Sequence, residues 1–145
     1  MTPVTKLLLL IIGLFLFFTV RSMFAQPAKP IGNRITPAEA AARVRAGTAI
    51  LIDVREPAEW DSGVAAPAYL LPLSDLKGAR KKWAHVLKDA KGKEFLLYCR
   101  SGGRSGQAAA ILAKQGFTTA NAGGFNEWKS ANLPTRQPDD PAGNE

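Results

Sequence analysis

Short apolar runs that alternate with segments of helical pattern constrain the fold of this chain more than any other feature. Four runs suit short buried strands: residues 49–54, 69–71, 94–98 and 117–120. Helical patterns lie between and around them: residues 37–46, 57–61, 75–87, 105–115 and 123–128. Because strands and helices alternate, the sequence predicts an α/β domain with a mainly parallel sheet. Ligands of such domains bind past the carboxyl ends of the strands.

Two of the predicted helices differ in how clearly the sequence marks their ends. Thr36 and Glu39 have the spacing of a capping box, Pro37 occupies the first helical position, and Gly47 ends the segment. Residues 75–87 are predicted as one continuous helix.

The N-terminus has the pattern of an export segment. Lys6 precedes an apolar run over residues 7–20, and a cleavage zone that ends at Ala25 follows this run. This layout is typical of a cleaved secretory signal over residues 1–25. The alternative is an uncleaved membrane anchor over residues 4–20, although a run of 14 residues reaches only about 21 Å of a hydrocarbon core of about 30 Å. Either interpretation exports the domain and places it in a bacterial periplasm, soluble after cleavage or tethered to the inner membrane.

Composition shifts divide the rest of the chain. Residues 26–33 hold two Pro and one Gly and are predicted to form a linker, residues 34–135 the folded domain, and residues 136–145 a flexible tail. The chain has 19 Lys plus Arg against 12 Asp plus Glu, for a formal charge of +7. Anionic partners are therefore favoured over basic ones. A basic stretch over residues 80–93 is interpreted as a solvated helix face rather than a docking surface, and no motif predicts nucleic-acid binding.

One cysteine and one histidine restrict the chemistry of the chain. A single cysteine excludes an internal disulfide and a cysteine-based zinc site, and one histidine is too few for a histidine-rich metal centre. We therefore expect no metal site. Cys99 remains as a candidate nucleophile, between the strand at residues 94–98 and the helix at residues 105–115.

The loop C-R-S-G-G-R-S around Cys99 favours a reactive thiolate. Gly102 and Gly103 allow tight curvature that leaves backbone N–H groups pointing inward, and the following helix presents its positive N-terminus. Arg100 and Arg104 add positive charge. The pKa of Cys99 is therefore predicted to be lowered, and the loop to bind an anionic substrate. The alternative interpretation treats Cys99 as a small buried hydrophobic residue. That interpretation suits a cysteine in the middle of a strand or helix better.

Three segments resemble the rhodanese, or sulfurtransferase, domain family over about residues 34–135. They read LIDVREPAEWDSG, LLYCRSGGRS and GGFNEWKSANLPT, in that order. The first is similar to the signature D-V-R-x-x-x-E-[WY] of the family through Asp53, Arg55 and Glu59, and the third to its G-G-x-x-x-W ending. The resemblance implies a single-domain fold whose parallel central sheet is flanked by helices on both faces.

The same resemblance implies a sulfur-carrier activity. The Cys99 thiolate would attack the outer sulfur of thiosulfate or a related donor, and the resulting persulfide would pass its sulfur to cyanide, a thiol or a protein acceptor. Neither half-reaction requires a cofactor. The implied substrate-binding residues are those of the loop: Arg100, Ser101, Gly102, Gly103, Arg104 and Ser105.

Asp53, Arg55 and Glu59 are expected to support the site. Asp53 and Arg55 end a buried strand, where they either orient the Cys99 loop or form an internal ion pair, and the second interpretation is favoured. Glu59 is expected to pair with Arg104.

Two other functions compete with sulfur transfer. A non-catalytic rhodanese-like module could bind or deliver sulfur for a partner, but the intact cysteine loop argues against it. A small phosphatase or arsenate reductase is disfavoured because four residues separate Cys99 from Arg104, one fewer than in the phosphatases, and the tighter loop suits a single sulfur better than a tetrahedral phosphate.

Overall fold

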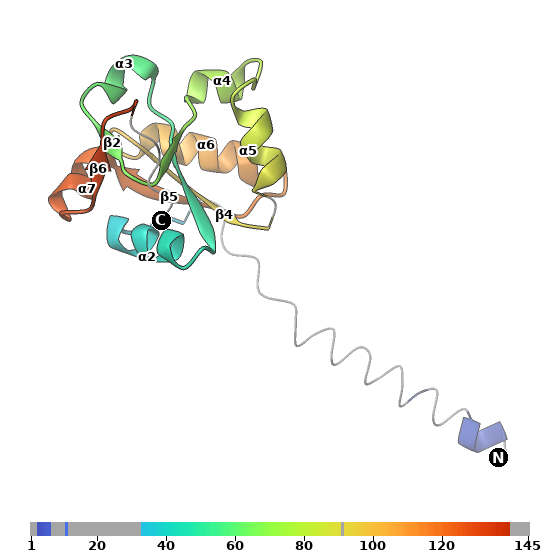
Figure 1. Ribbon diagram of the computed structural model, residues 1–145. Helices are drawn as coiled ribbons and strands as arrows, with labels where there is room; N and C mark the ends of the chain where they lie inside the picture. Colours follow the sequence, from blue (N-terminus) through green and yellow to red (C-terminus); the bar gives the residue numbers. More distant parts are fainter. Residues whose placement is uncertain (1–2, 7–10, 12–32, 91, 140–145) are drawn as a thin grey trace.

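The computed structural model describes residues 3–6, 11, 33–90 and 92–139 (Figure 1). The elements of the domain follow in chain order: α2 (Pro37–Arg45), β1 (Ala49–Asp53), α3 (Pro57–Trp60), β2 (Val64–Ala65), β3 (Ala68–Leu70), α4 (Leu73–Lys77), α5 (Trp83–Asp89), β4 (Glu94–Cys99), α6 (Gly103–Ala113), β5 (Thr119–Gly124), α7 (Phe125–Ser130) and β6 (Thr135–Arg136).

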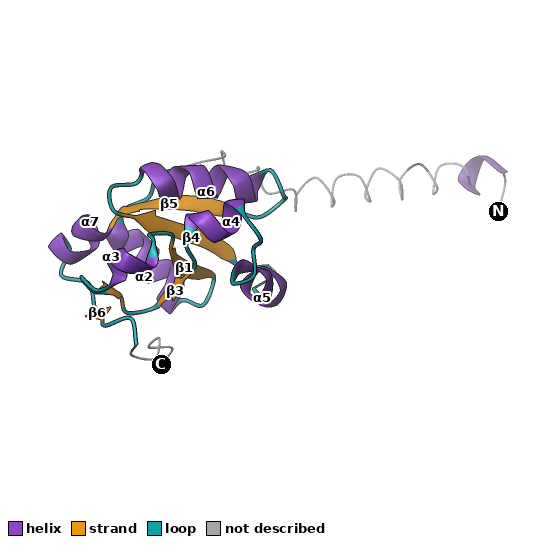
Figure 2. Ribbon diagram, turned by 90° about the horizontal axis from the view of Figure 1, so that it is seen from above, coloured by secondary structure: helices purple, strands orange, loops and turns teal. Residues whose placement is uncertain are grey.

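The central sheet has the strand order β3-β1-β4-β5, and all of its strand pairs are parallel. Helices α4, α5 and α6 pack on one face and helices α2 and α7 on the other, so that two hydrophobic cores form (Figure 2). The predicted α/β class, the mainly parallel sheet and the helices on both faces are therefore confirmed.

The alternation of side chains along β4 determines which of the two hydrophobic cores contains Cys99. Leu96 and Tyr98 belong to the core beneath α2 and α7, whereas Leu97 and Cys99 belong to the core beneath α6. This is the two-residue period of a strand whose two faces are both covered. Cys99 is the last residue of β4, so its side chain lies beside the start of α6.

The helix predicted over residues 75–87 is wrong as a continuous element. Two helices, α4 and α5, replace it, and Arg80 between them has a positive φ of 56°. The side chain of Asp75 accepts hydrogen bonds from the backbone N–H groups of Lys81 and Lys82 at 3.1 and 2.9 Å. A carboxylate that binds amides farther along the chain favours a turn over helix continuation.

Pairing at the end of the domain also differs from expectation. The strand predicted at residues 117–120 lies farther toward the C-terminus, as β5. The antiparallel pair of β2 and β6 was not predicted. The predicted tail begins within β6, where the Arg136 guanidinium donates to the carbonyls of Ala66 and Ala68 at 2.9 Å each. Residues 140–145 lie outside the described residues.

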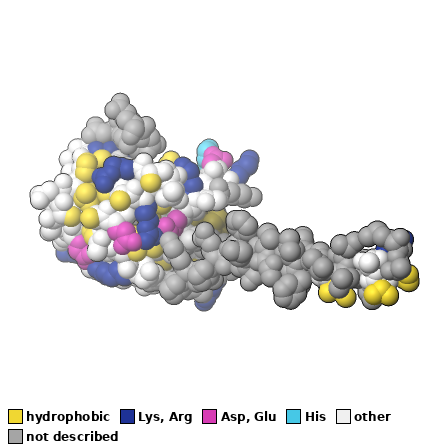
Figure 3. Space-filling model, turned by 90° about the horizontal axis from the view of Figure 1, so that it is seen from below, with side chains coloured by type: hydrophobic (Ala, Val, Ile, Leu, Met, Phe, Trp, Pro, Cys, Tyr) yellow, Lys and Arg dark blue, Asp and Glu magenta, His cyan; other side chains and the backbone are white. Residues whose placement is uncertain are grey.

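Asn33 marks where the described domain begins. Its carbonyl accepts a hydrogen bond from the Asn121 N–H at 3.0 Å, and the Ile35 N–H donates to the Asn121 carbonyl at 2.9 Å. The predicted signal or anchor lies almost entirely outside the described residues. Within residues 3–6, 11, 33–90 and 92–139, no helix has the length and apolar character needed to cross a membrane. On the face seen in Figure 3, positive and negative side chains lie intermixed.

Candidate active site

The sulfur of Cys99 lies beneath a loop that directs hydrogen-bond donors at it. Cys99 is only 1% exposed. The Gly102 N–H donates to Cys99 Sγ at 3.0 Å, and Gly102 has a φ of 102°, in the left-handed region that favours glycine. Gly103 then begins α6, as the predicted strand–loop–helix arrangement requires.

Hydrogen bonds, rather than neighbouring charge alone, favour the thiolate of Cys99. Burial raises the pKa of the thiol, but hydrogen bonds from the Ser105 side chain and from the backbone N–H groups of Ser105, Ser101 and Gly102 outweigh burial and lower the pKa below its ordinary value. The thiolate is the nucleophilic form. The loop therefore favours the ionised form of the Cys99 sulfur.

Arg104 is held by Glu59 rather than pointing freely at the sulfur. Its Nη1 and Nη2 atoms donate to the two Glu59 carboxylate oxygens at 2.6 and 2.7 Å, so the expected pair is confirmed. The Arg104 guanidinium lowers the pKa of Glu59 to about 2, and the pKa of Arg104 is raised in turn. This bidentate ion pair fixes the first turn of α6 to α3.

Asp53 and Arg55 form the buried ion pair that the sequence analysis favoured. Arg55 Nη2 donates to Asp53 Oδ2 at 2.7 Å and to the Gly63 carbonyl at 2.7 Å. Tyr98 Oη donates to Asp53 Oδ2 at 2.6 Å. Within the part of the chain that the structure describes, neither charge has a hydrogen bond to the Cys99 loop. Their geometry therefore supports a structural role, tying β1 to the turn after α3.

Asn121 on β5 is a positioning residue that the sequence analysis missed. Its Nδ2 donates to the Gly102 carbonyl at 2.9 Å, and its Oδ1 accepts from the Gly123 N–H at 3.0 Å. Ser105 Oγ lies 2.8 Å from Asn121 Oδ1 and 3.5 Å from both Cys99 Sγ and the Gly123 carbonyl oxygen, so its one hydroxyl proton is shared among three acceptors. The sequence signal was weak: Asn121 is an amide between two alanines just before the Gly-Gly pair of residues 123 and 124.

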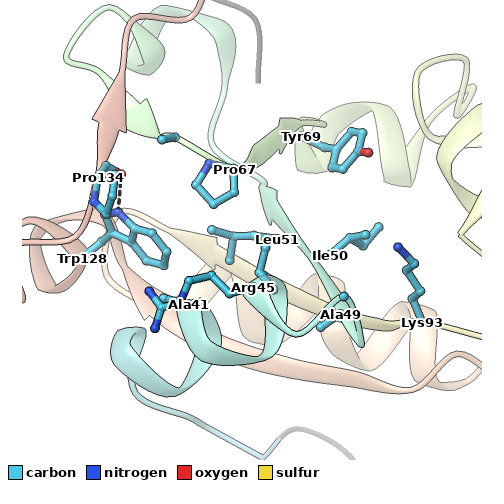
Figure 4. A pocket seen from close by; sticks show the side chains of 13 residues that line it. Ala41, Arg45, Ala49, Ile50, Leu51, Pro67, Tyr69, Lys93, Trp128 and Pro134 are labelled. Carbon is cyan, nitrogen blue, oxygen red and sulfur yellow. Dashed lines mark hydrogen bonds between the residues drawn. The ribbon is translucent and has the colours of Figure 1, made fainter. Parts of the chain in front are cut away.

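Two of the cavities near the sheet differ in chemistry. One, of about 320 Å³, opens beside the loop and is lined in part by Arg100 and Glu59. The other, of about 480 Å³, lies between α2 and the β1–β3 edge, where Leu51, Pro67 and Trp128 line it (Figure 4). This second cavity holds no nucleophile. No cluster of potential metal ligands occurs among the described residues.

Comparison with known proteins identifies the family. The family model for the rhodanese-like domain matches residues 36–131. An uncharacterized Synechocystis protein is 42% identical over 59% of this chain, which spans only 46% of that relative. The Bacillus subtilis protein YqhL is 36% identical over 84% of this chain and 90% of its own length. A protein of Allochromatium vinosum named sulfurtransferase is 34% identical over 62% of this chain and 80% of its own length.

Solved structures agree with that assignment. A rhodanese-related protein from Thermoplasma volcanium superposes with a TM-score of 0.60 at 27% identity, over 72% of this chain and 98% of the other. A Rhodopseudomonas palustris protein described as a possible tyrosine phosphatase has a TM-score of 0.61 at 25% identity, over 72% and 85% of the two chains. The chain belongs to the rhodanese-like domain family, which includes relatives named sulfurtransferases.

Proposed function

We propose that this protein is a sulfurtransferase that carries sulfane sulfur from thiosulfate, or a related donor, to a thiol or cyanide as a persulfide on Cys99. The observation that carries the proposal is the hydrogen bond from the Gly102 N–H to the buried Cys99 Sγ at 3.0 Å. A backbone donor fixed in this way stabilises negative charge on sulfur without reorganisation during the reaction.

In the first half-reaction, the Cys99 thiolate attacks the outer sulfur of thiosulfate. A bond forms between Sγ and that sulfur, the S–S bond of thiosulfate breaks, and its electron pair leaves with sulfite. Cys99 then carries an anionic persulfide. The cationic Arg100 side chain is exposed and directly follows Cys99 in the chain, where its charge favours approach of an anionic donor.

In the second half-reaction, a thiolate or cyanide attacks the outer sulfur of the persulfide. The new bond forms as the S–S bond to Cys99 breaks, and the electron pair returns to Sγ. The same loop N–H groups that stabilise the thiolate stabilise this leaving group, because it is the same sulfur in the same place.

Intact mass spectrometry tests the proposal directly. After incubation with thiosulfate, the protein should gain the mass of one sulfur atom and lose it on treatment with cyanide, with thiocyanate as the product. Cys99→Ala should gain nothing. Absence of both the adduct and thiocyanate from the wild-type protein would refute the enzyme and favour a non-catalytic binding module. Hydrolysis of p-nitrophenyl phosphate without sulfur loading would favour the phosphatase.

We also propose that the domain works after export across a bacterial membrane. The support is the sequence pattern of Lys6 followed by the apolar run over residues 7–20. The mass of the protein recovered from a periplasmic fraction tests this. Loss of residues 1–25 indicates a cleaved signal, full-length protein in the membrane fraction indicates an anchor, and full-length protein in the cytoplasmic fraction contradicts export.

A further inference from the structure

Arg34 lies against the loop around Cys99, although it precedes the segment that matches the family, residues 36–131. Its backbone forms an isolated parallel bridge with Asn121 on β5. Paired residues of neighbouring strands direct their side chains to the same face of a sheet. The Arg34 side chain therefore extends on the same face as the Asn121 side chain, and both reach Gly102.

Two glycines leave the space that the Arg34 guanidinium occupies. A Cβ built on Gly102 would lie only 2.6 Å from Arg34 Nη1, and a Cβ built on Gly123 would lie 3.3 Å from Arg34 Nη2. Both distances are shorter than ordinary van der Waals contact. The guanidinium therefore packs directly on the bare backbone of these two residues, which have positive φ angles of 102° and 82°.

Glu127, in the first turn of α7, holds the guanidinium in this position. Arg34 Nη2 donates to Glu127 Oε1 at 2.5 Å, and Glu127 Oε2 would lie 2.6 Å from a Cβ built on Gly123. The pair thus spans Gly123 and ends on Gly102. The two side chains are 52% and 46% exposed, so their attraction contributes little to the stability of the fold.

Gly102 is the residue whose orientation matters most to the sulfur. Its N–H donates to Cys99 Sγ at 3.0 Å, and its carbonyl accepts from Asn121 Nδ2 at 2.9 Å. A glycine can leave its φ of 102° at little steric cost, because it has no Cβ, and its N–H would then turn away from the sulfur. Contacts on both the carbonyl and the Cα of Gly102 restrict that movement, and Arg34 supplies the second.

We propose that Arg34 is a positioning residue: held by Glu127, it packs on Gly102 and keeps the Gly102 N–H directed at the sulfur of Cys99. The inference deepens the proposed sulfur transfer, and its consequence for the rate of that reaction rests on it. Arg34 takes no part in the making or breaking of bonds. It acts through the alignment of a donor that stabilises the thiolate.

Alkylation of Cys99 by iodoacetamide, followed as a function of pH on the full-length protein, tests this alignment without requiring sulfur transfer. Arg34→Ala frees Gly102, so the alkylation midpoint should rise by about 0.5 pH unit. Complete loss of a hydrogen bond to a charged group would raise it by about one unit or more, and the bond is only weakened here. Thiosulfate loading at neutral pH should be about three-fold slower, the same shift expressed as a ratio.

Glu127→Ala distinguishes alignment from charge. Removal of a nearby negative charge by itself lowers the pKa of a thiol, whereas loss of the contact that holds Arg34 should raise it. A midpoint displaced to higher pH supports the positioning role, and a midpoint that is unchanged or displaced to lower pH contradicts it. The other charged side chains around the loop, Arg100, Arg104 and Glu59, remain in both variants.

Arg43→Ala is the matched control, because it also removes an arginine that is paired with a glutamate. Arg43 Nη1 lies 2.9 Å from Glu94 Oε2, and Glu94 is the first residue of β4, at the end opposite Cys99. This variant should lower the melting temperature and keep the wild-type alkylation midpoint. All midpoints are measured well below the melting temperature of each variant.

The outcomes separate this inference from the function that it deepens. A wild-type midpoint in Arg34→Ala, or an equal displacement in Arg43→Ala, overturns the positioning role and leaves the sulfurtransferase intact. A protein whose midpoints respond as expected but which never loads sulfur refutes the proposed function and leaves the positioning of Gly102 in place.

Discussion

Burial and hydrogen bonding act in opposite directions on Cys99. The apolar core beneath α6 raises the pKa of the thiol, whereas the donors of the loop lower it, and the donors prevail. Cys99 can therefore stay 1% exposed and still ionise. Reactivity in this site depends on the number of donors that reach the sulfur rather than on its exposure to water.

Ser105→Ala tests that dependence. It removes the side-chain donor while keeping the backbone N–H groups, so the pKa of Cys99 should rise. Alkylation by iodoacetamide, followed as a function of pH, should show its midpoint displaced to higher pH. Thiosulfate loading at neutral pH should be about ten-fold slower, since a hydrogen bond to a charged group is worth about 1.5 kcal/mol or more.

Ser101→Ala is the matched control for that experiment. Ser101 is exposed and acts on Cys99 through its backbone N–H, which alanine retains. Its alkylation midpoint should equal that of the wild-type protein. A midpoint unchanged in Ser105→Ala would show that the backbone donors alone set the pKa of Cys99.

The sequence predicted the strand–loop–helix position of Cys99, the proposed nucleophile, but missed the residue that positions its loop. Cys99 could be predicted because the strand end, the glycines and the helix start are consecutive in the chain. Asn121 lies 22 positions after Cys99 in the sequence, and its side chain reaches the loop only because β4 and β5 are neighbours in the sheet. Without the register of that pair, a buried asparagine on a strand has no predictable partner.

At the scale of elements, one ion pair connects α3 to α6. Glu59 Oε2 accepts from the Glu56 N–H at 2.9 Å as well as from Arg104. The same carboxylate therefore caps α3 and fixes the first turn of α6, directly after the loop around Cys99. Because α3 is only four residues long, contacts of this kind, rather than its intrinsic helical propensity, hold it in place.

The pH dependence of stability should report this connection. The pKa of Glu59 is about 2 in the folded protein, against 4.5 ordinarily. The ionised pair therefore stabilises the fold fully above about pH 4.5, and this contribution is lost as the pH falls toward 2. Glu59→Gln should lower stability by about 1 kcal/mol at neutral pH and flatten the loss between pH 4.5 and 2. Urea unfolding at several pH values measures both effects.

Asp61→Asn supplies the comparison for Glu59→Gln. Asp61 is exposed at the end of α3, and it has no ion pair within the described segments. Removing this carboxylate should leave the slope between pH 4.5 and 2 close to that of the wild-type protein. Equal slopes for Glu59→Gln and Asp61→Asn would contradict a special contribution from the pair with Arg104.

Local sequence predicted helices well where their ends are marked within the same few residues. Thr36 caps α2 by accepting from the Glu39 N–H at 3.2 Å, as the capping-box spacing indicated. The break between α4 and α5 depends instead on Asp75, which binds amides six and seven positions ahead. The β2–β6 pair is beyond local prediction altogether, since Val64 and Arg136 meet from distant parts of the chain.

At the scale of the whole molecule, the boundary of the domain is set by pairing rather than by composition. The glycine and prolines of residues 26–33 predicted a linker up to Asn33. Asn33 nevertheless binds the backbone of Asn121, as does Ile35 at the start of the predicted domain, and the Asn121 side chain supports the loop around Cys99. The family match begins only at residue 36. Residues 33–35 are therefore structurally part of this domain, and they contact the residue that positions the loop around Cys99.

Two fragments should behave differently for this reason. A fragment of residues 33–139 should have the same melting temperature as the full-length chain. A fragment of residues 36–139 loses the buried Ile35 side chain, which is 6% exposed, and both hydrogen bonds to Asn121. These losses amount to about 3 kcal/mol and should lower Tm by about 12 °C or more.

Sulfur loading should distinguish loss of stability from loss of support for the loop. Measured well below its Tm, the fragment of residues 36–139 should still load thiosulfate more slowly than the fragment of residues 33–139. The reason is that the backbone of Asn121 has lost the partners that hold it on the side opposite β4. Equal loading rates would confine the N-terminal segment to a stabilising role, and equal melting temperatures would show that the domain begins where the family match does.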